Sequence, residues 1–169
     1  TLDQGSSGLI NEINLWEKFE DIAYFGTYDS QNNRNTIQTI HKNKVDVALL
    51  SYTYGTNDIQ PKQPYYINYF DEKQIKQDVV KAKKQSDVVI VSAHWGNEGK
   101  HQPNQMQQKY AKIFADAGVD VVIGTHPHVI QPVKWIKGKN NHKTLVAYSL
   151  GNFLNGQSTG DENNILGGN

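Results

Sequence analysis

Three stretches of the chain repeat apolar residues at the spacing of an α-helix. These stretches are residues 7–20, 71–85 and 104–117. Each one places its apolar side chains on a single face, which predicts an amphipathic helix packed against a core. The expected N-caps are Ser6 or Ser7 for the first helix and Asp71 for the second, because short polar side chains accept hydrogen bonds from the first helical N–H groups. Gly118 is expected to end the third helix.

Short runs rich in strand-forming residues predict a sheet. The predicted strands are residues 37–41, 45–52, 87–92, 120–123, 132–136 and 144–149. The first two flank a tight turn and predict a hairpin. The runs at 87–92 and 120–123 are continuously apolar between their polar ends Asp87, Ser92 and Asp120, as expected of strands buried on both faces. A helix joins them by short connections, which predicts a right-handed crossover between parallel strands. Residues 55–70 predict an ordered, irregular loop.

Composition predicts one soluble domain over residues 1–169. The chain has 17 basic and 17 acidic residues, and its mean hydropathy is −0.67. Zero net charge gives no electrostatic reason to expect nucleic acid as a partner. The absence of cysteine from the sequence excludes disulfides, zinc–thiolate sites and thiol nucleophiles. Any metal would therefore be held by histidine, aspartate, glutamate or asparagine.

Histidines come directly after both strands of the predicted crossover. His94 comes after the run at 87–92, and His126 and His128 come after the run at 120–123. Because the carboxyl ends of parallel strands meet at one edge of a sheet, we expect the three imidazoles to lie together there. Imidazole is the commonest side-chain metal ligand, so the pattern predicts a metal site. The alternative is that these are loop histidines with ordinary hydrogen bonds.

Two further side chains are candidates for the same edge. Glu98, four residues after His94, is a candidate metal ligand, general base or partner that orients an imidazole. A solvated loop carboxylate is the alternative for Glu98. Asn152 comes after the last predicted strand and would either bind an oxyanion or phosphate oxygen or cap a turn. The sequence contains neither the Gly-x-Ser-x-Gly element of hydrolases nor a glycine-rich phosphate-binding loop.

The blocks that hold these residues resemble the CapA family of capsule or poly-gamma-glutamate synthesis proteins, which is placed in the calcineurin-like metallophosphoesterase superfamily. The blocks are His94-Trp95-Gly96 with Glu98, residues 117–128 with Gln131-Pro132, and residues 148–153. The opening residues 1–9 are similar to the segment directly after the Asn-Asn-His motif of that family. The resemblance covers nearly the whole chain.

The resemblance implies an α/β fold, a layered sandwich of mixed β-sheets flanked by helices, metallophosphoesterase-like and N-terminally truncated. His94, His126 and His128 would be metal positions with Glu98 close by. The implied cofactor is a divalent metal (Mn, Fe or Zn), and the upstream ligands that complete its site would be missing from this segment. Glu98 and His94 are the catalytic candidates, and Asn152 is the candidate for substrate binding.

The resemblance implies a component of capsule or poly-gamma-glutamate synthesis or export at the cell surface. Such a protein would be extracytoplasmic, held to the membrane by an N-terminal anchor absent from this sequence. Its partners would be an anionic polymer or phosphoester substrate and other membrane components of the polymer synthesis complex. One alternative is a metal-dependent phosphoesterase or cell-surface polymer hydrolase. A second alternative is a non-catalytic binding or scaffold module.

Overall fold

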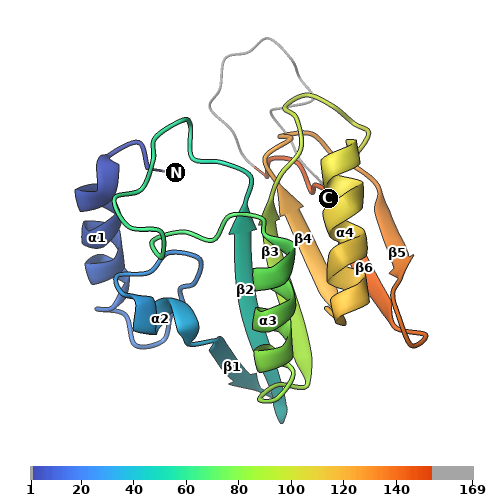
Figure 1. Cartoon of the computed structure of the whole chain (residues 1–169), viewed down its shortest axis with the longest axis horizontal. Coiled ribbons are helices and arrows are strands. Elements are labelled where there is room, and N and C mark those ends of the chain that lie inside the picture. The colour runs from blue at the N-terminus through green and yellow to red at the C-terminus, as the bar shows by residue number, and fades with distance from the viewer. Residues whose placement is uncertain (1, 154–169) are drawn as a thin grey trace.

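A six-stranded mixed sheet forms the centre of the computed structural model, which describes residues 2–153 (Figure 1). Its strands are β1 (Gln38–Lys42), β2 (Val45–Thr53), β3 (Val88–His94), β4 (Val121–Thr125), β5 (Val133–Lys137) and β6 (Lys143–Ala147). They lie in the order β1-β2-β3-β4-β6-β5. The central strands β2, β3, β4 and β6 are parallel, and the edge strands β1 and β5 are antiparallel to their neighbours. The predicted α/β fold with a mixed sheet is confirmed.

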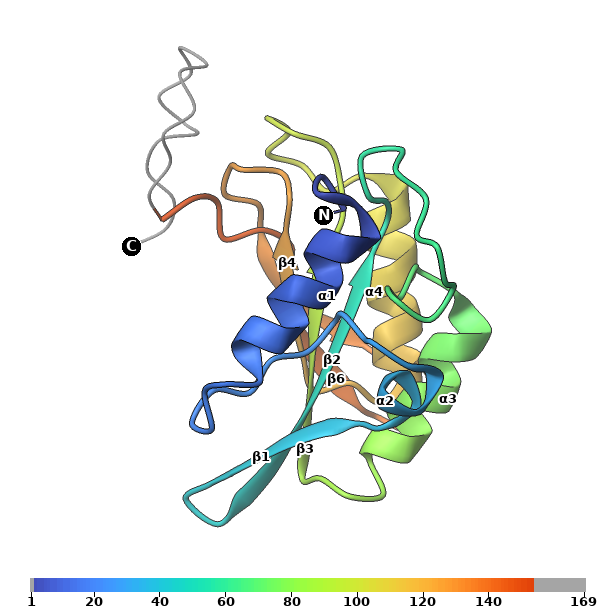
Figure 2. The same cartoon turned by 90° about the vertical axis from the view of Figure 1, so that its left-hand side faces the viewer.

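The helices are α1 (Gly5–Trp16), α2 (Gln31–Asn35), α3 (Glu72–Ala82) and α4 (Gln105–Ala117). Figure 1 shows α3 and α4 side by side over one face of the sheet, and in Figure 2 α1 and α4 lie on either side of β2. Asp71 caps α3 by accepting a 2.7 Å hydrogen bond from the Gln74 N–H, and Gly118 ends α4 in the left-handed conformation. Within the described residues, no helix is long and apolar enough to cross a membrane.

The first helix differs from its prediction at both ends. It begins at Gly5 and ends at Trp16, so the expected cap at Ser6 or Ser7 is wrong. Ser6 instead lies inside α1, where its hydroxyl accepts a 3.3 Å hydrogen bond from the Lys62 N–H of the irregular loop. The Ser6 side chain therefore makes a tertiary hydrogen bond instead of the helix cap that the sequence predicted.

The predicted hairpin and the predicted loop are both confirmed. Strands β1 and β2 are joined through Asn43 and Lys44, whose φ angles of 52° and 64° suit the twist of a tight hairpin. The loop at 55–70 has no helix or strand, but it is anchored to the sheet by a bridge between Thr53 and Tyr69. The buried Asn68 side chain also donates a 2.9 Å hydrogen bond to the hydroxyl of Tyr28.

The two faces of the sheet are covered unequally. The face under α3 and α4 is fully buried, with side chains that include Ala48, Leu50, Val89, Val91, Val122 and Val146. Side chains on the opposite face are only half-buried or exposed, and Ile123 there is 37% exposed. Within the described residues, the expectation that the strands at 87–92 and 120–123 are buried on both faces is wrong, because α3 and α4 bury only one face of the sheet. We call the face of the sheet opposite α3 and α4 the open face. It includes Val47, Leu49, Ser51, Val88, Ile90, Ser92, Val121 and Ile123.

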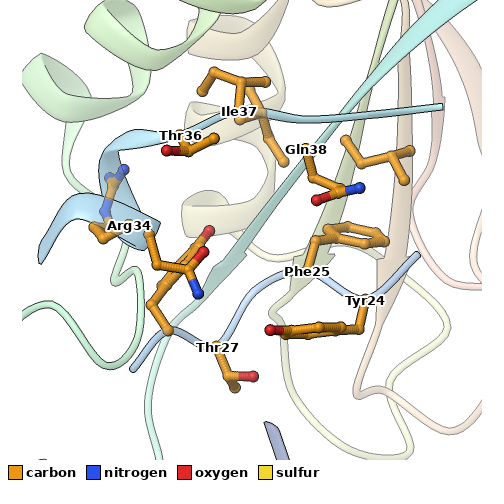
Figure 3. Close-up of a pocket in the computed structure, with 11 residues that line it drawn as sticks. Tyr24, Phe25, Thr27, Arg34, Thr36, Ile37 and Gln38 are labelled. Atoms are coloured by element: carbon orange, nitrogen blue, oxygen red, sulfur yellow. The ribbon is translucent and has the colours of Figure 1, made fainter. Parts of the chain in front are cut away.

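A buried ion pair joins α2 to α3. The Arg34 guanidinium donates two hydrogen bonds, of 3.3 and 2.7 Å, to the Asp78 carboxylate. Tyr52 donates a third hydrogen bond of 2.8 Å to the same carboxylate. Beside Arg34 is a small cavity of about 70 Å³, shown in Figure 3 with Tyr24 and Phe25 on its other side. This volume holds only a few water molecules, and the Arg34 guanidinium is already paired with Asp78. The cavity is therefore not a candidate functional site.

Candidate functional site

The histidines at the ends of β3 and β4 lie together at the carboxyl edge of the sheet. His94 ends β3 and is the register partner of Thr125, the last residue of β4. The ring centroids of His94 and His126 are 4.7 Å apart, and those of His126 and His128 are 6.2 Å apart. The structure therefore brings the three predicted histidines to one place, and their role as metal ligands stays a prediction.

Glu98 joins two of these histidines in a group suited to metal binding. One ligand atom from each of Glu98, His126 and His128 lies within 4.8 Å of the other two. Within the group, Glu98 Oε1 lies 4.0 Å from His128 Nε2. Ligand atoms that surround one ion are about 3.4 Å apart, so the group fits an ion after closing by about 1 Å. His94 lies outside this group, with its ring tilted by 53° against the ring of His126.

A strained turn directs His126 and His128 toward the group. Both residues have positive φ angles, 96° and 61°, which are uncommon for residues with a Cβ. The turn is held in place by the preceding strand end, where Gly124 packs directly against Tyr148 and Trp95. A Cβ at Gly124 would collide with the Tyr148 carbonyl oxygen, which accepts a 2.8 Å hydrogen bond from the Trp95 indole. The buried core thus holds the strained turn in position.

A hydrogen bond sets which nitrogen the His128 imidazole offers. The Asn152 side-chain oxygen lies 2.8 Å from Nδ1 of His128. Because this oxygen only accepts, Nδ1 carries the hydrogen and Nε2 keeps its lone pair, which faces Glu98. Nδ1 of His94 lies 3.1 Å from the hydroxyl of Thr125, which can donate or accept, so this contact orients the ring without fixing its tautomer. Asn152 therefore contacts His128, and the substrate-binding role assigned to it stays a prediction.

The surroundings keep two of the imidazoles neutral. Burial, and next the neighbouring His126, lower the pKa of His94 from 6.5 to about 4. Burial also lowers the pKa of His126. Both rings are therefore uncharged at pH 7, which is the form that binds metals and accepts protons.

Tyr54 is a site residue that the sequence pattern did not reveal. Its ring stacks on His94 with centroids 5.9 Å apart and planes 11° apart, and it lies 4.7 Å from the ring of His126. Its backbone N–H donates a 3.0 Å hydrogen bond to the His94 carbonyl. Tyr54 comes directly after β2, as His94 ends β3, so its position at a strand end was a signal present in the sequence.

Two buried glutamines connect the segments that carry the site, and the sequence pattern did not reveal them either. Gln107 of α4 donates a 2.7 Å hydrogen bond to Gln131, which in turn donates one of 2.7 Å to the Lys100 carbonyl. Gln107 also forms a reciprocal capping box with Asn104. Gln107 is fully buried and Gln131 is 2% exposed. The segment after β3, which contains Glu98, is thereby tied to the segment after β4.

Comparison with known proteins identifies relatives over most of this chain. It is 31% identical to the PGA biosynthesis protein CapA of Bacillus subtilis over 156 residues, which are 90% of this chain and 40% of that protein. It is 32% identical to the capsule biosynthesis protein CapA of Bacillus anthracis over 159 residues, 90% of this chain and 37% of that protein. The chain thus spans about 40% of the length of these curated relatives.

The family itself is shown by a match that covers nearly all of the chain. The model of the family described as "Bacterial capsule synthesis protein PGA_cap" matches residues 1–157. This match and the two relatives confirm the resemblance drawn from the histidine, Glu98 and Asn152 blocks. The chain belongs to the PGA_cap family of bacterial capsule synthesis proteins.

Proposed function

We propose that the protein takes part in making or exporting an anionic capsular polymer, such as poly-gamma-glutamate, and that Glu98, His126 and His128 bind a divalent metal in that work. Membership of the capsule synthesis family supports the first part. The observation that carries the second part is the convergence of two imidazoles and one carboxylate within 4.8 Å at the carboxyl edge of the sheet. The names of the two Bacillus relatives describe those proteins, and we extend them to this one.

Each side chain has a distinct part in this proposal. His128 offers Nε2, with Asn152 fixing its tautomer, and the neutral His126 offers a second nitrogen. Glu98 adds a negative charge that offsets the charge of a cation. Two nitrogens and one oxygen suit zinc, manganese or iron, the metals that the family resemblance implies. A bound divalent ion would act as a Lewis acid toward a phosphoryl or acyl oxygen.

His94 is the candidate general base beside this group. Its low pKa keeps a lone pair available at pH 7, and the Thr125 hydroxyl and the Tyr54 ring orient the imidazole. His94 would take a proton from a water or substrate hydroxyl held between it and the metal ligands. Glu98 is the other catalytic candidate. Its side chain is 67% exposed, so its carboxylate can reach a substrate.

We also propose that the working protein lies outside the cytoplasm and is attached to the membrane. The family role supports this, because a capsule is assembled at the cell surface. The partners would be the growing anionic polymer and other membrane components of the synthesis complex. A chain of zero net charge is not expected to bind nucleic acid.

Metal analysis of the full-length protein tests the site. Purified protein is loaded with manganese, iron or zinc, and bound metal is counted by mass spectrometry. We expect stoichiometric metal in the wild type and loss of it in the His126→Ala/His128→Ala double variant. His41→Ala is the matched control, because His41 is an exposed histidine on β1, away from the group. Full metal content in the double variant would exclude this site.

Deleting the gene tests the role in the capsule. Surface polymer should fall in the deletion strain and return with the wild-type gene, but not with the double variant. Unchanged polymer in a producing strain would refute the capsule role. Hydrolysis of model phosphoesters, lost in the double variant, would instead favour the metal-dependent phosphoesterase. A protein that binds no metal and still restores polymer would favour the scaffold module.

A further inference from the structure

The outer side of the helix layer, away from the sheet, carries a concentration of lysines. Helices α3 and α4 lie side by side on the sheet (Figure 1). Residues 72–84 and 105–117, which include the two helices, contain seven lysines and three acidic residues. We call the surface that these lysines form the lysine face. Its members are all exposed: Lys73, Lys76, Lys81, Lys83, Lys84, Lys109 and Lys112.

The helical period gathers these lysines on one surface. The buried apolar residues of α3 face the sheet, and Lys73 and Lys81 lie on the outer side, about 12 Å apart along the helix axis. Helix α4 adds a second row beside the first. The pKa of Glu72 on α3 is lowered by Lys76 and also by Lys109 of α4, so the two rows are close together. The lysines of both helices therefore share one surface.

The net charge of zero conceals a separation of charge between the two sides of the molecule. Residues 1–30 contain six acidic residues and one lysine, Lys18. Helix α1, which lies in this acidic segment, is on the opposite side of β2 from α4 (Figure 2). Solubility alone is served by mixed charges and needs no such separation. A surface dominated by one sign attracts ligands of the opposite sign, so the lysine face is suited to an anion.

Few carboxylates neutralise the lysine face. Glu72 pairs with Lys76, and Asp116 pairs with Lys112, each at 2.5 Å. The third acidic residue of the two helices is buried in the ion pair with α2. Four lysines form no salt bridge with any of the described residues: Lys73, Lys81, Lys84 and Lys109. The lysine face thus keeps a net positive charge.

The chemistry of lysine keeps this face in water in the whole protein. The chain spans about 40% of the length of its curated relatives. Lysine ammonium groups are strongly hydrated, and burying them without partner carboxylates is costly. Any further part of the protein would therefore pack on the open face, where apolar side chains are exposed, in preference to the lysine face.

The weakness of single lysine contacts limits the kind of ligand. A pair between one exposed lysine and one carboxylate is weak and is screened by salt, so a small anion would not be held. A chain with a carboxylate on every repeat could pair with several lysines at once. Helices that bind a membrane surface also insert apolar side chains, and Val80 is the only exposed large hydrophobic residue of α3 and α4. The lysine face therefore suits a linear polyanion.

We propose that the lysine face binds the anionic polymer along α3 and α4. The identity of the polymer rests on the proposed function, and the lysine face adds where the protein holds it. Each helix connects two parallel strands, so both helices begin at the carboxyl edge of the sheet. Asn104, at the start of α4, donates a 3.1 Å hydrogen bond to Asn97, next to Glu98. A polymer along the helices would therefore run toward the edge that carries the metal-binding group.

Binding of end-labelled poly-gamma-glutamate to the full-length protein, measured by fluorescence anisotropy, tests the lysine face. The Lys73→Gln/Lys81→Gln/Lys84→Gln variant removes three unpaired charges and leaves the core unchanged. We expect it to bind the polymer about tenfold more weakly than the wild type. Lys73→Gln/Lys109→Gln keeps the basic C-terminal turn of α3 and covers the case in which the triple variant folds poorly. It should weaken binding about fivefold.

A second triple variant controls for net charge. Lys18→Gln/Lys42→Gln/Lys62→Gln removes the same total charge from exposed lysines outside the two helices. It should bind the polymer within about twofold of the wild type, because charges beyond the Debye length are screened. Equal losses in the two triple variants, or wild-type binding in both lysine-face variants, would overturn the proposal.

Salt and alternative probes identify the kind of ligand. Binding of the polymer should weaken as sodium chloride is raised, and free glutamate should not compete at equal carboxylate concentration. Vesicles of phosphatidylglycerol are the membrane probe. Binding to these vesicles without binding to the polymer, or competition by free glutamate as strong as that by unlabelled polymer, would also overturn the proposal.

Metal content separates the lysine face from the proposed function. The lysine-face triple variant should keep its metal, and the His126→Ala/His128→Ala double variant should keep its binding of the polymer. A protein that binds metal but no polymer would refute the lysine face alone. Unchanged surface polymer in the deletion strain would refute the proposed function, even where the purified protein binds the polyanion.

Discussion

Replacing Gln107 by leucine tests whether the buried glutamines hold the candidate site together. The side chain of Gln107 donates a hydrogen bond of 2.7 Å to the Gln131 side-chain oxygen. It accepts a hydrogen bond of 3.0 Å from the Asn104 N–H. Leucine has a similar size but can make neither bond. The variant should therefore loosen the tie between the segment that carries Glu98 and the segment that carries the histidines.

The size of the effect is set by burial. The oxygen of Gln131 would be left without its donor at a residue only 2% exposed, which costs about 1–3 kcal/mol. Asn104 keeps its side-chain cap on the backbone N–H of residue 107, but its own N–H loses the Gln107 acceptor, which adds up to about 1 kcal/mol. The apolar leucine side chain offsets a small part. We expect a net loss of about 3 kcal/mol in the free energy of unfolding.

Urea unfolding monitored by tryptophan fluorescence measures this loss, and calorimetry measures metal affinity in the same samples. Affinity should fall about tenfold, as is typical when a group that supports the ligands is removed. Gln108→Leu is the matched control, since it changes the adjacent residue of α4, whose side chain is exposed. A loss below about 1 kcal/mol, or one equal to that of Gln108→Leu, would refute the reasoning.

Three further perturbations probe other parts of the structure. Asn152→Leu should lower metal affinity about tenfold in calorimetry, because His128 loses the acceptor that fixes its tautomer, whereas Asn152→Asp keeps an acceptor and should stay near wild type. Arg34→Met should cost about 3 kcal/mol in urea unfolding, because Asp78 is fully buried and loses its charged partner; a cost under about 1 kcal/mol would contradict the buried pair. The pKa of His94 is about 4 in the folded protein against 6.5 ordinarily, so the unfolded chain takes up the proton first. The metal-free protein should accordingly lose about 1 kcal/mol as pH falls from 6.5 to about 4, after discounting for the partly exposed ring, and His94→Gln should remove this slope.

Features with local causes could be predicted from the sequence. Asp71 caps α3 and Gly118 ends α4 because capping depends on a few neighbouring residues. The gathering of His94, His126 and His128 could also be predicted, since it needs only two parallel strands that end at the same edge. In these cases the periodicity and the strand ends contained the necessary information.

Features that depend on distant contacts could not be predicted. Gln107 occupies a polar position in an amphipathic pattern, and only its partner Gln131 makes it a buried residue. The capping role expected of Ser6 failed for a similar reason, because Lys62 of the loop takes its hydroxyl. The apolar runs of β3 and β4 matched strands covered on both faces, but helix positions decide which face is covered, and the sequence pattern does not contain them.

The direction of His94 is set by the packing of the residue after it. Successive side chains of a strand point to opposite faces, so His94 faces the open side only because Trp95 faces the core. Trp95 is fully buried, packs against Phe114, and donates to the Tyr148 carbonyl. A slip of one residue would expose Trp95 and bury His94. The same contacts that stabilise the core therefore hold His94 on the open face, beside His126 of the metal-binding group.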